Sequence, residues 1–505
     1  MIRPVERIAV ADMGSNSWRL VVFGYEPGTA WWSLVDEIRE AVRVGAGLAE
    51  EGAIRPERFD RALHTAAVFA SFCRASGIDQ VQALATSAIR DAANGAELLG
   101  AIRDETGLEP RVISGHEEAH YDWLAIANST TIETGFGLDM GGGSIQALRI
   151  EDRRLSEAES LRLGSVRVSE EFLPGEKARG KAMKALRKKA AADLEALGWW
   201  GEGGRLVGVG GTIRNLAAAA MRRAELPPID VQGFALSRDA LEDLIELLAD
   251  RPASRRGELP GIKPDRGDVI LGGALVLAAA LDSGGFDRIE VTEAGLREGA
   301  FFERFLGEQE LFEDVRRASV LNLGHRFDGD TGHVERVAQL SLEMFDGLAR
   351  AGLHELGAAE RELLWAACML HDIGTAIDYD DHHRHSQYLI LNTGLPGFTP
   401  RELLLVGLIA RYHRKGEPDT SQLGPLEEPG DAGRLRLLSA IIRLAEQFER
   451  SRDGAIREVR VTAQDGTVAL AAEVDPARDP SVPIWAARRE AGLLAHAIGR
   501  EVEIG

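Results

Sequence analysis

The stretch VADMGSNSWRL, Val10 to Leu20, carries an apolar segment into a polar turn that contains a glycine. The centre of the stretch, from Asp12 to Ser17, combines an acidic residue, a glycine and three small residues that form hydrogen bonds. The segments on either side, RIAVADMG and RLVVFGYE, have the pattern of buried strands. We therefore predict two consecutive strands joined by this turn, which is either a plain hairpin or a site for an anion.

The same pattern returns further along the chain as DMGGGS, Asp139 to Ser144, again after a strand-like segment. We interpret the two stretches as an internal duplication, which predicts two similar lobes that face each other across a cleft. A third glycine-rich turn, VGVGGT, runs from Val207 to Thr212. Glycine-rich turns after strands point several backbone N–H groups at one place. The three together therefore favour a phosphate-binding site over three structural turns.

Acidic residues accompany these turns. Asp12 and Asp139 each stand two residues before a loop glycine, and carboxylate oxygens are the ligands that Mg²⁺ prefers. Glu117 and Glu118 follow a Ser-Gly turn in ISGHEEAHY, where a carboxylate can orient or deprotonate an attacking water. The alternative for these glutamates is structural, because acidic residues at the start of a helix complement its dipole. The pattern as a whole predicts phosphoryl chemistry assisted by Mg²⁺ or another divalent cation.

Length, charge and cysteine content limit the possible functions. A chain of 505 residues predicts roughly two to four domains. Its net charge of −21 argues against broad binding to nucleic acid or to a membrane surface. No apolar run is long enough to span a bilayer, and the segment MIRPVERIAV lacks the apolar core of a signal peptide. The two cysteines, Cys73 and Cys368, indicate no disulfide framework, so we expect a cytoplasmic protein.

Positive charge is concentrated in one segment, EKARGKAMKALRKKAA, which holds five of the seven lysines. Steps of four, three and four residues place four of them on one face of a predicted helix. These four are Lys177, Lys181, Lys184 and Lys188. The face is either a solvated helix surface or a path for a polyanion.

The character of the chain changes near residue 307, after which it is helical in pattern and rich in histidine. A short tail with strand-like alternation around an Asp-Gly turn follows, and a last helix comes after it. We predict four segments. They are a first lobe over 1–126, a second lobe over 127–306, an all-α domain over 307–452 and a small α+β segment over 453–505.

The motifs together resemble the Ppx/GppA phosphatase family of exopolyphosphatases and guanosine pentaphosphate phosphohydrolases. The matching stretches are DMGSNSWRL, ATSAIRDAAN, ISGHEEAHY, DMGGGSIQ, LRLGSVRVSEEF, VGVGGTIRNLA and EAGLREG, in order over the first 306 residues. The resemblance implies an α/β fold with two ribonuclease-H-like lobes of the actin/Hsp70/sugar-kinase type. It also implies release of a terminal phosphate in the interlobe cleft, a need for Mg²⁺, and a homodimer.

Site residues follow from the resemblance position by position. The water-activating base is Glu117 or Glu118, with Glu117 preferred, and the metal-site carboxylates are Asp12 and Asp139. The phosphate-binding residues are Gly14, Ser15, Asn16, Ser17, Arg19, Arg90, Gly141, Gly142, Gly143, Ser144, Gly210, Gly211, Thr212 and Arg297. One departure is Gln146, which stands where the family carries an acidic residue and weakens a metal role at that position.

The helical part resembles the HD-type domain that longer family members carry. His333, the pair His371-Asp372 in LHDIG, and Glu446 in place of a distal aspartate are the candidate ligands of a second metal ion. His385 and His413 are available as further ligands. The resemblance also allows a scaffold that extends the polyphosphate path, with Arg411 and Lys415 as polyanion contacts. Whether a metal binds there stays open at this point.

The expected function is that of an exopolyphosphatase acting from the chain end of inorganic polyphosphate. The alternative within the same chemistry is 5′-phosphohydrolase activity on guanosine pentaphosphate (pppGpp), or both activities. A catalytically weak sensor of polyphosphate or nucleotide is a second class, and the intact glutamates and glycine loops argue against it. A sugar kinase or chaperone ATPase on the same fold fits the DMGSNS and HEEA motifs poorly.

Overall fold

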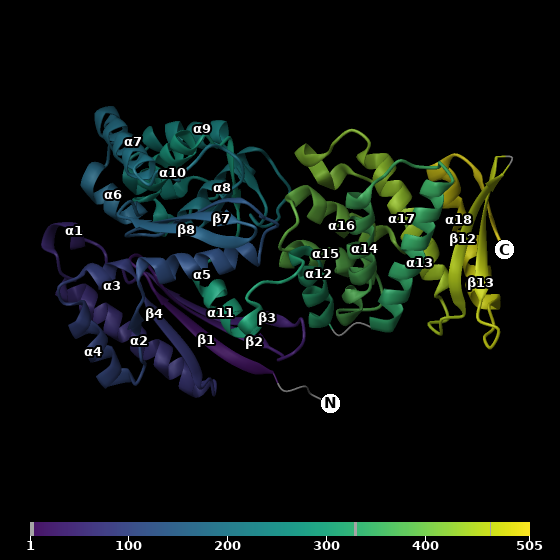
Figure 1. Cartoon of the computed structure of the whole chain (residues 1–505), viewed down its shortest axis with the longest axis horizontal. Helices are drawn as coiled ribbons and strands as arrows, with labels where there is room; N and C mark the ends of the chain where they lie inside the picture. Colours follow the sequence, from purple (N-terminus) through teal and green to yellow (C-terminus); the bar gives the residue numbers. More distant parts are fainter. Residues whose placement is uncertain (1–4, 328–330, 465) are drawn as a thin grey trace. The chain divides into compact units, whose positions relative to one another are not determined.

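The computed structural model describes residues 5–327, 331–464 and 466–505. The chain forms two compact units, which are described separately (Figure 1). The first unit comprises Met1–Ala224 and Val231–Val315, and the second comprises Glu225–Asp230 and Arg316–Gly505. Among the described residues, no helix combines the length and apolar character needed to cross a membrane.

The first sheet of the first unit has the strand order β3-β2-β1-β4-β5. Its strands are β1 (Glu6–Met13), β2 (Trp18–Tyr25), β3 (Trp32–Glu40), β4 (Gln80–Ala85) and β5 (Arg111–Val112). Strands β1 to β3 form an antiparallel meander, and β4 and β5 add to it in parallel. Alternate residues of β1 enter different cores, because successive side chains point to opposite faces. Ala9 and Ala11 pack with α2 (Pro56–Ala75) and α4 (Gly95–Thr106), whereas Ile8 and Val10 face the core between the sheets.

The second sheet repeats this plan with the order β8-β7-β6-β9-β11-β10. Its strands are β6 (Gly135–Met140), β7 (Ile145–Glu151), β8 (Arg154–Leu161), β9 (Leu206–Val209), β10 (Ala235–Ser237) and β11 (Arg288–Val291). An antiparallel β6-β7-β8 meander is again followed by parallel strands, β9 beside β6 and β11 beside β9. Only β10 has no counterpart among the described strands of the first sheet. The internal duplication and the two-lobed α/β fold predicted from DMGSNS and DMGGGS are therefore confirmed.

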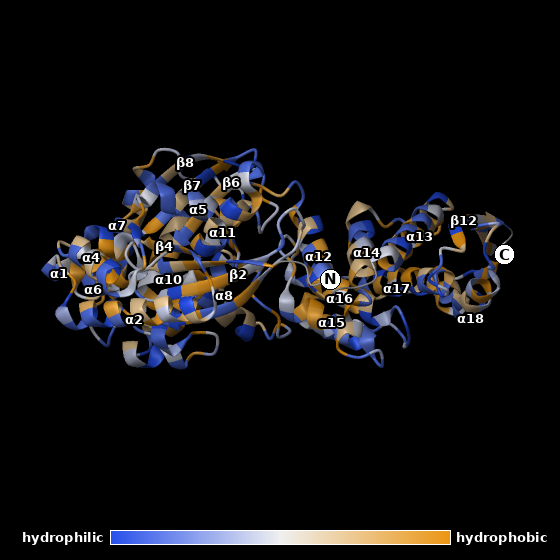
Figure 2. Ribbon diagram, turned by 90° about the horizontal axis from the view of Figure 1, so that it is seen from below, coloured by the Kyte–Doolittle hydropathy of each residue, from blue (hydrophilic) through white to orange (hydrophobic). Residues whose placement is uncertain are grey.

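Helices fill the space around and between the two sheets. α5 (Gly115–Ala127) and α11 (Leu296–Leu306) pack against each other and lie between the sheets (Figure 1). Phe301 of α11 stacks on Phe23 of β2 with ring centroids 4.4 Å apart, which ties the lobes together. Figure 2 shows β2 hydrophobic along much of its length, as expected of a strand buried on both faces. The remaining helices of this unit are α1 (Leu48–Glu51), α3 (Ser87–Asp91), α6 (Ser165–Phe172), α7 (Gly180–Glu195), α8 (Gly211–Arg223), α9 (Arg238–Ala249) and α10 (Ile270–Gly284).

The second unit is helical and ends in a small sheet. Its helices are α12 (Val315–Arg326), α13 (Thr331–Arg350), α14 (Ala358–Leu370), α15 (His382–Thr393), α16 (Pro400–Tyr412), α17 (Asp431–Phe448) and α18 (Ser481–Ile498). The sheet has the order β12-β13-β14, with β12 (Ile456–Gln464), β13 (Thr467–Val474) and β14 (Glu501–Ile504). One apolar core runs through this unit from Val320 to Ile504. The predicted all-α region and its small α+β tail are both present.

Candidate phosphate and metal sites

The opening stretch forms a hairpin whose four-residue loop, Gly14 to Ser17, joins β1 and β2 between the paired residues Met13 and Trp18. Ser15 and Asn16 in this loop are buried although polar. The Oγ of Ser15 lies 3.2 Å from the Oγ of Ser87 at the start of α3, so one hydrogen bond links the loop to the ATSAIRDAAN motif.

The second loop, Gly141 to Ser144, joins β6 and β7 in the same way and meets the first loop directly. A Cβ atom added to Gly143 would lie 2.8 Å from the Oγ of Ser15 and 2.5 Å from the Oγ of Ser87. A side chain at Gly143 would force these two hydroxyls to move, because the loops of the two lobes approach closely. A small pocket opens beside the contact and is lined by Ser15, Gly45, Leu48, Ala88, Gly142, Gly143, Val166, Arg167 and Glu170.

The third loop lies against the carboxylate of Asp139. Gly210 has φ of 101°, and a Cβ atom there would lie 2.7 Å from Oδ1 of Asp139, so both backbone conformation and space demand glycine. Helix α8 begins at Gly211 directly after it. Thr212 in its first turn is fully buried, and its hydroxyl has no hydrogen-bond partner among the described residues. The second loop thus contacts the first, and the third loop contacts Asp139, which precedes the second.

Asp12 and Asp139 occupy equivalent positions in the two sheets. Asp12 pairs with Arg19 across the first hairpin, and Asp139 pairs with Gln146 across the second. Burial raises the pKa of Asp12, and Arg297 and Arg19 oppose that rise. Burial also raises the pKa of Asp139 to about 6, with Arg214 lowering it and Asp12 raising it. The negative charges of these two carboxylates repel each other, and a divalent cation would offset that repulsion. Carboxylate oxygens are also the ligands that Mg²⁺ prefers.

The two adjacent glutamates have different environments. Glu117 completes a capping box at the start of α5, where Oε2 accepts a hydrogen bond of 2.8 Å from the Ser114 N–H. Its Oε1 lies 2.7 Å from Nη1 of Arg111, so both carboxylate oxygens are engaged in a structural role. The side chain of Glu117 thus caps the helix and remains half exposed, which favours a structural role, and its predicted role as the base stays a prediction.

Glu118 is the glutamate that faces the loop aspartates. It is only 6% exposed, and Oε2 has no hydrogen-bond partner among the described residues. Nη1 of Arg90 lies 3.5 Å from that oxygen. Burial, and then the charge of Asp139, raise the pKa of Glu118 to about 8 against the opposing effect of Arg90. A raised pKa in a cleft is typical of a group that exchanges protons during catalysis.

A further buried carboxylate, Asp122, escaped the sequence analysis. It follows Glu118 by one turn of α5 and is 0% exposed, and neither of its oxygens has a hydrogen-bond partner among the described residues. Burial, followed by the charges of Asp139 and Glu118, raises its pKa well above the ordinary value. Gln146, by contrast, donates a hydrogen bond of 3.1 Å from Nε2 to the Oγ of Ser144. It thus supports the second loop rather than adding another charge beside Asp139.

Six cationic side chains gather beside the loops. Arg297 is 5% exposed, and its Nε and Nη1 have no partner among the described residues. The others that interact electrostatically in this group are Arg19, Arg39, Arg214, Lys263 and Arg266. Burial, reinforced by Arg297 for Arg19 and by Arg39 for Arg266, lowers the pKa of both guanidinium groups to about 10. Repulsion among the positive charges of this group favours the binding of an anion, which would offset them.

Sequence reasoning found two of these cations and missed four. Arg19 and Arg297 stand inside recognisable motifs, and Arg214 follows the GGT of the third loop by two residues. Arg39, Lys263 and Arg266 belong to no motif and arrive from β3 and from the segment before α10. Arg90, predicted to bind phosphate, donates to the Ile113 carbonyl at 2.7 Å as well as approaching Glu118.

The predicted lysine face is shorter than expected. Helix α7 begins at Gly180, so Lys177 lies before the helix and does not belong to its face. Lys181, Lys184 and Lys188 are exposed on α7. In the second unit, Lys415 pairs with Asp381 at 2.7 Å, and Arg411 donates to Oε1 of Gln387 at 3.0 Å. A polyphosphate path over these residues stays a prediction.

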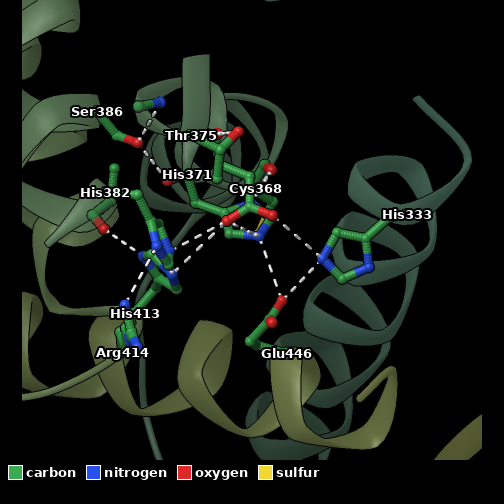
Figure 3. Close-up of polar contacts among 12 residues, drawn as sticks. His333, Cys368, His371, Thr375, His382, Ser386, His413, Arg414 and Glu446 are labelled. Atoms are coloured by element: carbon green, nitrogen blue, oxygen red, sulfur yellow. Dashed lines mark hydrogen bonds and ion pairs between the residues drawn. The ribbon is translucent and has the colours of Figure 1, made fainter. Parts of the chain in front are cut away.

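The histidine-rich part brings its four predicted ligands together. Nε2 of His333 on α13 lies 2.9 Å from Oε2 of Glu446 on α17, and Nε2 of His371 lies 3.3 Å from the same oxygen (Figure 3). Asp372 completes a group with His333 and His371 whose ligand atoms lie within 4.8 Å of one another. Glu446 therefore lies beside His333 and His371, as expected from the sequence, and its role as a metal ligand stays a prediction.

A second group in the same unit contains Asp372 with His382 and His413. Of the two further ligands suggested from the sequence, His413 is present, whereas His385 is replaced by its neighbour His382 on α15. Burial lowers the pKa of His413 to about 3, with His371 adding to the effect. Burial also lowers the pKa of His371, but the carboxylates of Asp372 and Glu446 outweigh it and raise the pKa to about 9.

Comparison with known proteins identifies relatives for both units. The model of the Ppx/GppA phosphatase family matches residues 21–308, and that of the Ppx/GppA phosphatase domain III matches residues 315–476. A Ppx/GppA family member from Aquifex aeolicus is 27% identical, with a TM-score of 0.52 over 60% of this chain and 99% of that one. An exopolyphosphatase from Cytophaga hutchinsonii is 23% identical, with a TM-score of 0.56 over 61% and 100%, and shares the fold.

Proposed function

Because this chain belongs to the Ppx/GppA phosphatase family, we propose that it is an exopolyphosphatase that removes the terminal phosphate of inorganic polyphosphate. Family membership supports phosphate-releasing hydrolysis in general, and the choice of polyphosphate rests on the site. An anion with many closely spaced charges suits the group of Arg19, Arg39, Arg214, Lys263, Arg266 and Arg297 beside the glycine loops. This group in a chain of net charge −21 is the observation that carries the proposal.

The loops and helix termini would hold the terminal phosphate. The first two loops would offer backbone N–H groups and the hydroxyls of Ser15 and Ser144. The N-terminus of α8 would offer the hydroxyl of Thr212, which has no partner among the described residues. Donors of this kind stabilise the charge that develops on equatorial phosphate oxygens during in-line displacement. Arg297, buried with two unpaired nitrogens, would add a fixed positive charge to the same region.

Asp12 and Asp139 would hold a divalent cation, as expected from the family. Such an ion, when bound, neutralises phosphate charge and helps to orient the substrate. Glu118 would orient the attacking water and accept its proton, because its carboxylate is buried and faces the loop aspartates. Arg90, 3.5 Å from Oε2 of Glu118, would position that carboxylate. Release of shortened polyphosphate would complete the cycle.

A comparison of two substrates tests the proposal. The purified chain is assayed with Mg²⁺ on long-chain polyphosphate and on pppGpp, and phosphate release is followed under identical conditions. The proposal expects a higher kcat/KM for polyphosphate. A clear preference for pppGpp would instead assign the site to nucleotide 5′-phosphohydrolysis. Absence of turnover on both substrates, with binding retained, would indicate a sensor.

A further inference from the structure

Three buried histidines of the second unit are held in the same way by the backbone. Nδ1 of His371 lies 2.6 Å from the Cys368 carbonyl oxygen, Nδ1 of His382 lies 2.9 Å from that of Tyr379, and Nδ1 of His413 lies 2.6 Å from that of Ala410. A carbonyl oxygen only accepts, so Nδ1 of His371 and Nδ1 of His413 each carry a proton and donate it. For His382, the carbonyl contact of 2.9 Å is shorter than the 3.3 Å approach of Nη1 of Arg414 to the same Nδ1, which favours the same tautomer. In the neutral ring, Nε2 then presents a lone pair, which is the arrangement that backbone partners impose on metal-ligating histidines.

The lone pairs of two of these rings face each other. Nε2 of His382 lies 3.0 Å from Nε2 of His413, and both side chains are buried (Figure 3). Two neutral rings that both donate through Nδ1 have no proton to share between their Nε2 atoms. Oδ1 of Asp372 lies 3.2 Å from Nε2 of His382 and 4.0 Å from Nε2 of His413. A cation between these three atoms would satisfy all of them.

The same aspartate also belongs to the group on its other side. Oδ2 of Asp372 lies 3.7 Å from Nε2 of His333, and Oδ1 lies 3.7 Å from Nε2 of His371. Oε2 of Glu446 approaches both of these histidines, at 2.9 Å and 3.3 Å. Two sets of converging ligands therefore share the carboxylate of Asp372. The ligands come from five helices or their ends, namely α13, α14, α15, α16 and α17.

We propose that this cluster is a two-metal centre in which Asp372 bridges two divalent transition-metal ions. His333, His371 and Glu446 complete the first position, and His382 and His413 complete the second. The mixture of imidazole and carboxylate ligands suits Mn²⁺, Fe²⁺ or Zn²⁺, whereas Mg²⁺ and Ca²⁺ prefer oxygen ligands alone. The centre is separate from the Asp12 and Asp139 site and does not depend on the proposed function of that site.

A basic residue accompanies the bridging carboxylate. Nη2 of Arg452 lies 2.7 Å from Oδ2 of Asp372, and the arginine side chain is 43% exposed. A carboxylate oxygen has two lone pairs, so it accepts this hydrogen bond and still binds a metal ion. Arg452 thus orients the bridge from the solvent side, as outer partners of metal ligands do.

Metal content of the full-length chain tests the proposal. The protein is stripped with a chelator, reloaded with Mn²⁺, desalted and analysed for bound metal per chain. Relative to the unchanged chain, we expect loss of one ion in His382→Gln/His413→Gln, loss of one in His333→Gln/His371→Gln, and loss of two when all four are replaced. His354→Gln, whose ring bonds to the Phe345 carbonyl away from the cluster, serves as the control and should lose none. Any ion held by Asp12 and Asp139 contributes equally to all of these proteins.

Electron paramagnetic resonance supplies a measurement that needs no variant. Two Mn²⁺ ions bridged by one carboxylate are expected to show exchange coupling in the unchanged chain. Equal metal content in all folded variants, or no exchange-coupled Mn²⁺ signal at full loading of the unchanged chain, would overturn the proposal, whereas an uncoupled signal from the Asp12 and Asp139 site is common to all of these proteins. Circular dichroism and thermal unfolding of each variant confirm that a loss of metal is not a loss of fold.

Discussion

Oε2 of Glu118 lies 3.5 Å from Nη1 of Arg90, inside the first unit and beside the aspartates of both lobes. The preceding glutamate, Glu117, instead closes the capping box of α5. Adjacent residues on a helix point about 100° apart, so one glutamate reaches the cleft and the other reaches Ser114 and Arg111. This division supports the proposal that Glu118 carries the chemistry, whereas Glu117 caps the helix.

Replacing each glutamate separately tests that division. Glu118→Gln removes the proton acceptor while keeping the side-chain volume, and we expect kcat for phosphate release to fall by about 10²–10⁴-fold. Glu117→Gln is the matched control, and it should keep most of the activity. It should cost only about 0.2–1 kcal/mol in the free energy of unfolding, because glutamine still completes the capping box and only the exposed ion pair with Arg111 is lost. Steady-state kinetics and denaturant unfolding measure both effects. The assignment is wrong if Glu117→Gln is the inactive protein.

The pH dependence of activity follows from the raised pKa of Glu118. Burial and the charge of Asp139 place that pKa at about 8, and only the deprotonated carboxylate accepts a proton from water. We therefore expect kcat/KM to increase with pH up to about 8 and then to level off. A cation bound by Asp12 and Asp139 would offset their charges and lower the pKa of Glu118.

Profiles of kcat/KM against pH at several Mg²⁺ concentrations measure this effect. The acidic limb should move to lower pH as Mg²⁺ increases and should disappear in Glu118→Gln, whose residual activity no longer depends on that group. An acidic limb that stays at one pH whatever the Mg²⁺ concentration would argue against the coupling of Glu118 to the aspartates.

Lys263 and Arg39 test the role of the cationic group. Their charges lie beside Arg19 and Arg266, and we expect Lys263→Gln and Arg39→Gln each to raise KM for polyphosphate by about tenfold, because a charge-assisted contact is lost. The effect should shrink as salt screens the remaining charges. Arg222→Gln removes an equal charge from the far end of α8 and serves as the control. Similar KM values for all three variants would show that the group does not bind substrate.

The glycine-rich loops could be predicted from the sequence because local residues determine them. Several side chains that lie beside the loops could not be predicted, because distant parts of the chain supply them. A strand that ends in DMGSNS or DMGGGS specifies its own turn, because the glycines and small polar residues act within a few positions. The proximity of Glu446 to His333 and His371 could also be predicted, because the His371-Asp372 pair marks the expected site. Arg266 and Asp122 carry no such local signal.

Arg266 and Asp122 reach the candidate site through contacts that form only in the folded chain. Arg266 comes from a segment before α10 and meets the third loop, where its Nη2 would lie 2.9 Å from a Cβ atom on Gly211. Lys177 failed as a member of the lysine face because α7 begins three residues later, and helix boundaries are weakly encoded. His382, and not His385, lies in the group with Asp372 and His413, because the phase of a helix start decides which side chain turns inward.

Asp122 is predicted to destabilise the first unit at neutral and alkaline pH. Its folded-state pKa is well above the ordinary 3.8, so the folded chain keeps a proton that the unfolded chain has already released. The free energy of unfolding therefore falls as pH increases above about 4 and continues to fall until the folded-state pKa is passed. Asp122→Asn resembles the protonated acid in shape and does not titrate. We expect it to match the unchanged chain near pH 4 and to exceed it by about 1–3 kcal/mol at pH 8.

Denaturant unfolding of both proteins from pH 4 to pH 8, in the presence of a chelator, measures the difference. The same series with Mg²⁺ separates a buried structural acid from a ligand, because an ion that binds only the folded chain stabilises it. If Asp122 were a ligand, Mg²⁺ would protect the unchanged chain and fail to protect Asp122→Asn. Equal protection of both proteins, together with a stability gap that widens with pH, is the outcome that the burial and the unpaired oxygens of Asp122 predict.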